Sequence, residues 1–419
     1  MLPKFFYNKI FRIISLSVLG VAAVLLALDR SSRIGIGSDF HVFWQAGYDF
    51  FHGLNMYEAI EGARILIYPP FAAFLFQPLA IFPLQASAAI FYLLNVLVLL
   101  PLSIWMLREI LNLIGFSKER VDITLVLAVL LSFKFFFNNL GIFQVNFLVF
   151  TISLAGIYNY FYRREGLAFV FLVIATCIKI YPVFLLLFVF FACLKDRRAI
   201  LQGVAAGIIC MGIPVAVRGI EIYQVYYEFF LEEFAKGVVW VSANNHGLKS
   251  AVYKVFLPWG TKVNLFPEQA PLASVVSNLL LLLVLILTIM TAWKAIKSRD
   301  PLRLILAFSC IMIFSHMVSG ITWTAHLVSL LFILVPLLLQ MDRKKRRGEQ
   351  VVFVGLMAIA LILSIEGSDT TGRFFYELVR TYDLFTLFLL SLLVYFTYLA
   401  YSEQVYSPMT PQSLPYEST

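Results

Sequence analysis

The stretch YPPFAAFLFQPLAIFP, residues 68–83, decides the fold of this chain. It is strongly apolar, but it is shorter than the roughly 20 residues that a helix needs to cross a bilayer. It also contains four prolines, which remove backbone donors and interrupt helices. We therefore predict a re-entrant or interfacial segment here and not a membrane span. The choice matters for the whole chain, because one more span would reverse the side on which every later loop lies.

The composition of the chain is that of a membrane protein. Of the 419 residues, 61% are hydrophobic and 13% are charged, whereas soluble domains carry about 25% charged residues. Apolar stretches of spanning length are expected at 11–29, 86–107, 122–138, 144–162, 166–180, 181–194, 199–217, 272–293, 301–318, 324–341, 350–365 and 384–401. With the first stretch retained as a helix and not cleaved, the sequence predicts an all-α, polytopic transmembrane bundle of about 12 spans.

The distribution of positive charge supports a membrane topology in which 68–83 does not cross. If 68–83 does not cross, most of the 32 Lys and Arg residues fall on the cytoplasmic side, as membrane proteins prefer. We expect a cytoplasmic (inner) membrane protein with both termini in the cytoplasm and a single membrane domain over 1–401. Its long extracytoplasmic loops would be 30–85 and 218–271, and 402–419 would form a short, disordered cytoplasmic tail. The net charge of +8 therefore marks cytoplasmic loops and does not indicate nucleic-acid binding.

Under this topology, unusual polar residues gather at the extracytoplasmic side. The candidates are Asp39, His41, Tyr68, Gln144, Asn146, Lys179, Asn245, His246, Trp323, His326 and Arg373. Polar groups at membrane depth are costly and usually line a cavity or serve a function. We therefore predict one outward-facing polar site. The sequence shows no metal-ligand spacing and no nucleotide-binding motif, so no metal and no cofactor are expected.

Asp39 precedes a run of aromatic residues at helical spacing, from Phe40 through Phe43 to Phe51. This pattern predicts an amphipathic helix in the membrane interface, with its rings at headgroup level. Such a helix would place the Asp39 carboxylate at the mouth of a lipid-accessible cavity. Alternatively, Ser38 or Asp39 caps the helix, and the two roles are compatible.

The remaining candidates each have a functional and a structural interpretation. Lys179 would neutralise a lipid-borne phosphate, or it extends its amine to the interface from a helix end. The amides of Gln144 and Asn146 would bind sugar hydroxyls or a diphosphate, or satisfy backbone groups between helices. His326 would contact a phosphate or a sugar, or is a packing residue. Arg373 is a weaker candidate for a phosphate contact.

The order of several short motifs resembles glycosyltransferase family 87, a family of membrane enzymes in the GT-C superfamily. The motifs are Asp39-Phe40, Gly53 with Tyr57, Tyr68-Pro69-Pro70, Gln77-Pro78-Leu79, Gln144-Val145-Asn146, Lys179 with Pro182, Asn245 with Gly247, and Ser319 to His326. The chain is similar to polyprenyl-phosphate-mannose-dependent mannosyltransferases of this kind.

The resemblance implies an inverting transfer of a sugar, mannose or a similar hexose, from a polyprenyl-phosphate donor to a lipid or glycan acceptor. It implies that Asp39 is the general base. Lys179, His326 and Arg373 would bind the donor phosphate. The substrate-binding residues would be His41, Tyr68, Gln144, Asn146, Asn245, His246 and Trp323. A transporter or flippase of lipid-linked glycans is the alternative. It would be expected to carry intramembrane charged pairs or repeated halves, and the main charge within a span is Lys134.

Overall fold

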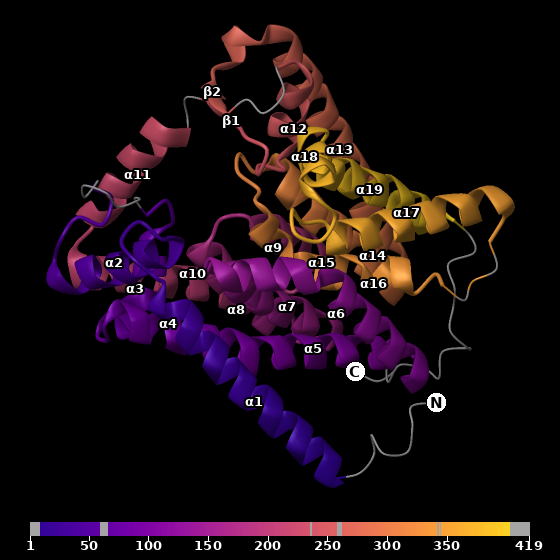
Figure 1. The fold of residues 1–419 in the computed structure, drawn as a ribbon. Coiled ribbons are helices and arrows are strands. Elements are labelled where there is room, and N and C mark those ends of the chain that lie inside the picture. The colour runs from indigo at the N-terminus through magenta and orange to yellow at the C-terminus, as the bar shows by residue number, and fades with distance from the viewer. Residues whose placement is uncertain are drawn as a thin grey trace.

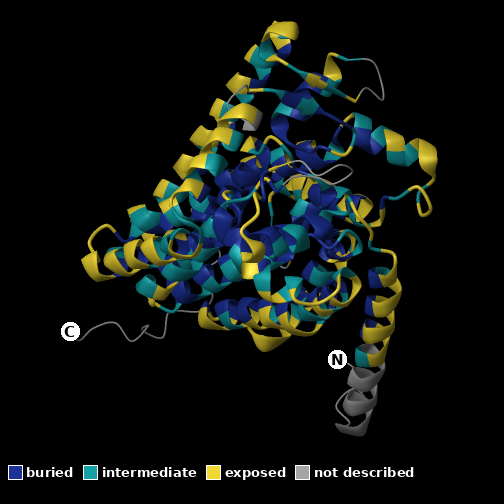
Figure 2. Ribbon diagram, turned by 90° about the vertical axis from the view of Figure 1, so that its left-hand side faces the viewer, coloured by how far each residue is buried: buried dark blue, intermediate teal, exposed yellow. Residues whose placement is uncertain are grey.

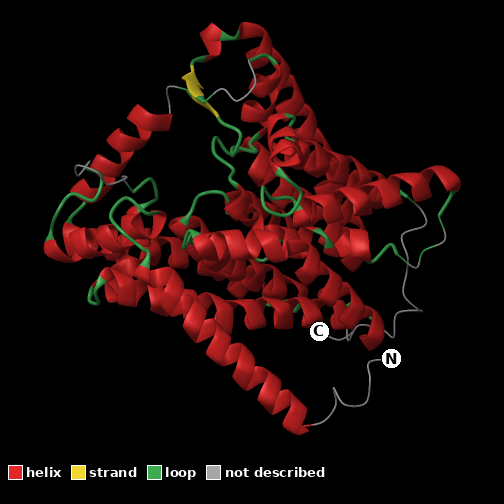
Figure 3. Cartoon of the chain, viewed as in Figure 1, coloured by secondary structure: helices red, strands yellow, loops and turns green. Residues whose placement is uncertain are grey.

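The computed structural model describes residues 9–58, 66–234, 237–257, 262–341, 343 and 345–402, and in these residues helices dominate (Figure 3). Apart from Ser402, the predicted tail 402–419 lies outside the described residues. Within the described part, a 24-residue helix, α1 (Lys9–Ser32), covers the first predicted span. The all-α fold expected from the sequence is confirmed.

Seven helices are long and apolar enough to cross a membrane among the residues described, which makes this a multi-pass membrane protein. They are the continuous helix Leu84–Leu113 (α4 Leu84–Leu93, η2 Leu94–Leu99 and α5 Leu100–Leu113), α6 (Lys118–Gly141), α10 (Arg197–Arg218), α13 (Pro271–Ser298), α14 (Pro301–Val318), α17 (Arg347–Ile365) and α19 (Leu384–Tyr401). Buried residues concentrate in the middle of the bundle, whereas the outer helices carry exposed residues (Figure 2). The central helix is α14, which is buried along almost its entire length.

Three consecutive helices beside this centre are short. They are α7 (Asn146–Phe161), α8 (Glu165–Ile178) and α9 (Val183–Ala192). At 1.5 Å per residue they measure about 24, 21 and 15 Å, less than the roughly 30 Å of a hydrocarbon core. They occupy the predicted spans 144–162, 166–180 and 181–194. Because each helix is shorter than the hydrocarbon core, the connections at its two ends need not lie at opposite membrane surfaces.

The last of the predicted spans before the basic loop, 324–341, is broken into short pieces. They are η4 (Thr324–Ser329), α15 (Leu330–Ile333) and α16 (Val335–Leu338). Backbone of this kind is tolerated at membrane depth where protein surrounds it or where it lines a cavity. The number of about twelve spans therefore remains a prediction.

The stretch 68–83 contains a helix of only 11 residues, α3 (Pro70–Ala80). Its length is about 16 Å, too short to cross a bilayer, as predicted. It packs closely on α2 (Asp39–His52), and a Cβ on Gly47 would lie 2.7 Å from the backbone carbonyl of Phe76. Only glycine at position 47 allows this approach of the two helices.

The helix α2 is the one predicted after Asp39, but its aromatic face has a different environment. Phe40 and Phe43 are buried, with 0% and 2% of their surfaces exposed, and pack on Phe76 of α3. Only part of the aromatic set, such as Phe51, is exposed. Phe40 and Phe43 therefore do not lie at lipid headgroups, because α3 and α4 offer an apolar surface that buries these rings. The interfacial position of the helix itself stays a prediction.

The long segment 218–271 forms a layer over one end of the bundle. Its described elements are α11 (Glu221–Phe234), β1 (Val239–Val241), α12 (Leu248–Val255), β2 (Val263–Leu265) and η3 (Pro267–Gln269). The two strands pair antiparallel, with Val239 opposite Leu265. The helix α18 (Arg373–Thr381) lies near α12 (Figure 1). These elements meet the turn between α14 and η4, residues 319–324, where the polar residues gather.

Candidate active site

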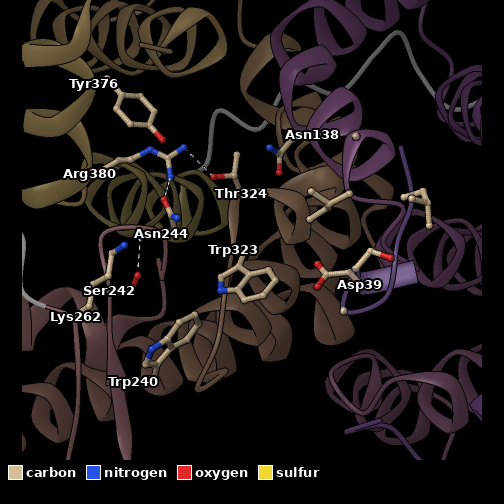
Figure 4. Close-up of a pocket in the computed structure, with 15 residues that line it drawn as sticks. Asp39, Asn138, Trp240, Ser242, Asn244, Lys262, Trp323, Thr324, Tyr376 and Arg380 are labelled. Atoms are coloured by element: carbon tan, nitrogen blue, oxygen red, sulfur yellow. Dashed lines mark hydrogen bonds between the residues drawn. The ribbon is translucent and has the colours of Figure 1, made fainter. Parts of the chain in front are cut away.

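A polar cavity of about 580 Å³ lies where these elements meet (Figure 4). Its lining comes from the start of α2, the end of α6, the segment after β1, the turn before η4, and α18. Functional groups on this lining include Asp39, Asn138, Trp240, Asn244, Lys262, Trp323, Thr324, Tyr376 and Arg380. The cavity thus combines a carboxylate, amides, cations and three aromatic side chains. Aromatic faces and hydrogen-bonding groups together suit a sugar.

Asp39 is the first residue of α2, and the structure separates its role from helix capping. The hydroxyl of Ser38 accepts the hydrogen bond from the backbone N–H of His41 at 3.2 Å, which is the N-cap interaction. The Asp39 carboxylate instead accepts a hydrogen bond of 2.7 Å from Nε2 of Gln144. It is directed toward the indole of Trp323 across the cavity (Figure 4). Capping therefore does not account for this carboxylate.

Lys179 lies beyond the last residue of α8, in the connection to α9, and is only 8% exposed. Its ammonium group donates to the side-chain oxygen of Asn146 at 2.6 Å and to the hydroxyl of Tyr68 at 3.2 Å. The Nε2 atom of His326 lies 3.0 Å from the same nitrogen. Three predicted site residues therefore meet around the amine of a fourth, Lys179. A snorkelling lysine would extend toward water, whereas this one is enclosed.

The hydrogen bonding of His326 makes this cluster short of an acceptor. Its Nδ1 accepts from the backbone N–H of Trp323 at 2.9 Å, so the hydrogen of the neutral ring is on Nε2. When Lys179 is charged, that hydrogen faces an ammonium group, which has no lone pair to accept it. Two donors thus converge where a negatively charged oxygen would satisfy both. The geometry favours an anion at this point.

Burial alters the ionisation of the groups in the cluster that lie outside helices. It lowers the pKa of Lys179 to about 7, against the opposing effect of the Asp39 charge. Burial also raises the pKa of Tyr68, and the Asp39 charge raises it further. Tyr68 therefore stays a neutral phenol, while Lys179 gains its charge most readily when an anion is bound.

Three members of this cluster, Tyr68, Lys179 and His326, line a smaller cavity of about 150 Å³ beside the large one. Trp323 and Thr324 line the large cavity, whereas Thr322 and His326 line the small one. The turn 322–326 is therefore a shared wall. On the other side, Gln144 holds Asp39 and Asn146, two residues later, holds Lys179. The Asp39 carboxylate and the Lys179 cluster are thus both hydrogen-bonded to the segment 144–146, and both lie beside the turn 322–326.

A buried ion network forms the far wall of the large cavity. The carboxylate of Glu366 pairs with Lys134 of α6 and, at 3.2 Å, with Arg380 of α18. The guanidinium group of Arg380 also donates to Asn244 and Thr324. Lys134, the charge that the sequence places within a span, therefore has a carboxylate partner. It helps to fix the wall that presents Arg380 to the cavity.

Asn245 lines neither cavity, although the sequence predicts it to bind substrate. Its amide donates to the carbonyls of Trp240 and Gly320 at 2.8 and 2.9 Å. Its oxygen accepts from the backbone N–H of Thr322 at 2.8 Å. The predicted role is corrected to a positioning one: the side chain ties β1 to the turn before η4. Its neighbour Asn244 is the residue that reaches the cavity.

His246 is likewise a positioning residue and not part of the cavity lining. Its ring is fully buried, and Nδ1 donates to the carboxylate of Asp383 at 2.8 Å. Lys254 of α12 donates to the same carboxylate at 2.8 Å. Burial lowers the pKa of His246 despite the Asp383 charge, so the ring is neutral near pH 7. The cluster anchors α12 to the start of α19.

Two other predicted site residues lie away from both cavities. His41 is buried in the packing of α2, with its ring centroid 6.1 Å from that of Trp44. Arg373 is exposed at the surface and pairs with Glu377 at 2.8 Å, one turn along α18. The predicted substrate contact of His41 is not supported, because its side chain is buried in the helix packing. The predicted phosphate contact of Arg373 is not supported either, because its side chain is exposed at the surface.

The sequence interpretation did not include Trp240, Lys262 or Tyr376 among the site residues. Each lies in the two segments that fold over the cavity, β1–β2 and α18. No periodicity or motif marks these positions, although an isolated tryptophan just before the polar run 242–246 was a usable signal. Only the folding of these segments onto the bundle brings the three side chains to the cavity.

Two solved structures are similar to this chain in fold. They are crystal structures of ArnT from Cupriavidus metallidurans, one bound to undecaprenyl phosphate and one in the apo state. The TM-scores are 0.49 and 0.46 at 13% sequence identity, over 94% and 92% of this chain and 76% of each ArnT chain. Among curated protein sequences, no significant match is found. The sequence model of one family does match, over residues 66–320, which is more than half of the chain. The protein therefore belongs to glycosyltransferase family 87, as its motifs indicated, and is a membrane glycosyltransferase.

Proposed function

We propose that the protein transfers a sugar, mannose or a similar hexose, from a polyprenyl-phosphate donor to a hydroxyl group of a lipid or glycan acceptor. The reaction inverts the anomeric centre and takes place at the extracytoplasmic face of the cytoplasmic membrane. One observation carries the proposal: a carboxylate, Asp39, and a pair of converging donors, Lys179 and His326, flank the same turn in two adjoining cavities.

The small cavity is suited to the donor phosphate. A phosphoryl oxygen near Lys179 would accept from its ammonium group and from Nε2–H of His326. The negative charge that develops on the leaving phosphate would be stabilised by donors that are already in place, which is the most effective form of electrostatic catalysis. The cluster lies at the end of the short helix α8, so the phosphate of a membrane-bound lipid can reach it.

The large cavity is suited to the acceptor and to the transferred sugar. Two buried polar atoms have no hydrogen-bond partner among the described residues: Nε1 of Trp323, which lines the cavity, and Oε1 of Gln144, whose amide contacts Asp39 of the lining. Buried polar groups without partners are uncommon in folded proteins. A sugar offers hydroxyl groups that both donate and accept, and would satisfy the two atoms at once. The ring of Trp240 provides an apolar face beside them.

The proposed chemistry uses Asp39 as the general base. The acceptor hydroxyl attacks the anomeric carbon from the face opposite the phosphate, and its proton passes to the Asp39 carboxylate. The bond between the anomeric carbon and the phosphate oxygen breaks, and its electron pair leaves with the polyprenyl phosphate. The hydrogen bond from Gln144 holds the carboxylate in position for this step.

The test is transfer by the purified protein in lipid nanodiscs. The protein is incubated with polyprenyl-phosphate mannose, and in parallel with the glucose and galactose analogues, together with a bacterial lipid extract. Mass spectrometry is expected to find an acceptor that gains one hexose with wild type and not with Asp39→Asn. If no donor yields such a product with the wild-type protein, the proposed function is wrong.

A further inference from the structure

One wall of the large cavity, on the side opposite Asp39, is built from three chain segments that fold over the bundle (Figure 4). Asn244 lies just after β1, and Lys262 lies just before β2. Tyr376 and Arg380 belong to α18, and Cζ of Arg380 lies 4.4 Å from the centroid of the Tyr376 ring. This wall therefore presents two cationic side chains to the cavity, away from the carboxylate that the proposed reaction uses.

The side-chain oxygens of this wall already accept hydrogen bonds within the protein. The guanidinium group of Arg380 donates to Oδ1 of Asn244 and, at 3.4 Å, to Oγ1 of Thr324. The backbone N–H of Asn244 donates to Oγ of Ser242 at 3.4 Å. Because both donors of an Asn amide are on its nitrogen, Asn244 keeps its N–H groups for the cavity. Together with the ammonium group of Lys262, they form a wall that offers mainly donors.

The buried ion network behind this wall holds more positive than negative charge. Among the described residues, its cations are Lys134, Lys254 and Arg380, and its carboxylates are Glu366 and Asp383. The Asp383 charge also acts on Arg380, so the two carboxylates serve one network. One positive charge is thus in excess, and Lys262 adds another at the cavity surface. Buried charge is costly unless it is paired, so an anion bound on the cavity side would stabilise this wall.

We propose that the acceptor carries an anionic group, a phosphate or a carboxylate, which binds to Lys262, Arg380 and Asn244. The proposal rests on the proposed function, because it takes the large cavity as the acceptor site. With its anionic group on this wall, the acceptor extends across the cavity and presents its hydroxyl group to Asp39. Hydrogen bonds between charged partners are about twice as strong as neutral ones. The wall therefore selects acceptors by their charge.

The test separates the acceptors by charge before the reaction. A bacterial lipid extract is divided on an anion-exchange column into neutral and retained anionic lipids. Each fraction is incubated with the protein in phosphatidylcholine nanodiscs and with polyprenyl-phosphate mannose or the hexose analogue that serves as donor. We expect transfer to the anionic fraction and at least tenfold less to the neutral one. Amidation of carboxylates with a carbodiimide and methylamine then tells the two groups apart, because a phosphate acceptor survives it and a carboxylate acceptor does not.

Lys262→Gln tests the wall itself. Lys262 is exposed, so the variant should fold as wild type does. The acceptor KM should rise about tenfold, since a hydrogen bond between charged groups is lost, and the donor KM should stay unchanged. Added salt should raise the acceptor KM of wild type more than that of the variant. The matched control is Lys249→Gln, which removes a positive charge from α12 outside the cavity lining and should keep the wild-type acceptor KM.

Three outcomes would contradict these expectations in different ways. Equal transfer to the neutral and anionic fractions, or an unchanged acceptor KM in Lys262→Gln, overturns the anionic acceptor and leaves the transferase function in place. A rise in the donor KM of Lys262→Gln, with the acceptor KM unchanged, also overturns it, because this wall would then bind the donor phosphate. If neither fraction gains a hexose with the wild-type protein, the proposed function itself is wrong.

Discussion

Nε2 of Gln144 donates a hydrogen bond of 2.7 Å to the carboxylate of Asp39. The two residues are about a hundred positions apart in the sequence: Asp39 is at the start of α2, and Gln144 is in the turn between α6 and α7. Since Ser38 provides the helix cap, Gln144 is the residue that orients Asp39 toward the cavity. This hydrogen bond gives the carboxylate a fixed direction at the cavity that Asp39 lines.

Asp39→Asn should lower the rate of sugar transfer by about 10²- to 10⁴-fold, the usual contribution of a general base. The amide keeps the size of the side chain and its place beside Gln144, so insertion and thermal stability should stay near wild type. The measurement is initial rate at saturating donor. Ser38→Ala is the control: it removes the N-cap, costs about 1 kcal/mol of stability, and should retain activity. Turnover by Asp39→Asn close to that of wild type contradicts the role.

Lys179→Met should lower kcat/KM for the donor by about 10²- to 10³-fold, the effect of removing a preorganised donor from a developing negative charge. Asn146 and Tyr68 remain in place, so the loss reflects the missing charge. The measurement is steady-state kinetics with the donor varied. An unchanged donor kcat/KM would place the phosphate elsewhere.

The pH dependence of donor use should reflect Lys179. Burial lowers the pKa of this amine to about 7, so the free enzyme carries the charge below that pH and loses it above. The kcat/KM for the donor should therefore fall above about pH 7, approaching tenfold per pH unit, because kcat/KM reports the free enzyme. Bound phosphate favours the charged amine, so kcat should fall only at higher pH. In Lys179→Arg, whose guanidinium stays charged, this decline should disappear if the variant binds donor.

Trp323→Phe should weaken acceptor binding and leave donor binding unchanged. The substitution keeps an aromatic ring in the cavity and removes the indole N–H, which has no partner among the described residues. One neutral hydrogen bond contributes about 0.5–1.5 kcal/mol, so the acceptor KM should rise by up to about tenfold. Equal changes in the donor and acceptor KM values would instead indicate that the turn carrying His326 has moved.

Asp383→Asn should destabilise the fold by about 3–5 kcal/mol, because it leaves Lys254 buried without a charge partner. Thermal unfolding in detergent or nanodiscs measures the effect. Arg373→Ala is the matched control from the same part of the chain: its ion pair with Glu377 is exposed, and exposed pairs contribute little. Both stability and activity should stay near wild type in that variant. A loss of donor binding in Arg373→Ala would restore the phosphate role that the sequence suggested.

The sequence predicted part of the candidate site, as one group of residues illustrates: Lys179, His326, Asn146 and Tyr68. All four were predicted, because polar residues at the same end of successive apolar spans must lie near one another in a bundle. Their mutual contacts were not predictable, since they depend on the shortness of α8 and on the break at 324–329. Asn245 and His246 were predicted to bind substrate, but their side chains bind other segments of the protein. The sequence of a polar loop does not distinguish residues that bind a ligand from residues that hold the loop in place.

The sequence by itself determined the membrane fold and the family, because bilayer insertion depends on the length and hydropathy of local segments and the motifs are read in chain order. It also determined that 68–83 is too short to span, since a helix rises only about 1.5 Å per residue. The tertiary structure alone decided which polar residues face a cavity. Long-range contacts, such as those of Arg380 with Glu366 and of Asp39 with Gln144, arise from how helices distant in sequence pack, and no local pattern encodes that packing.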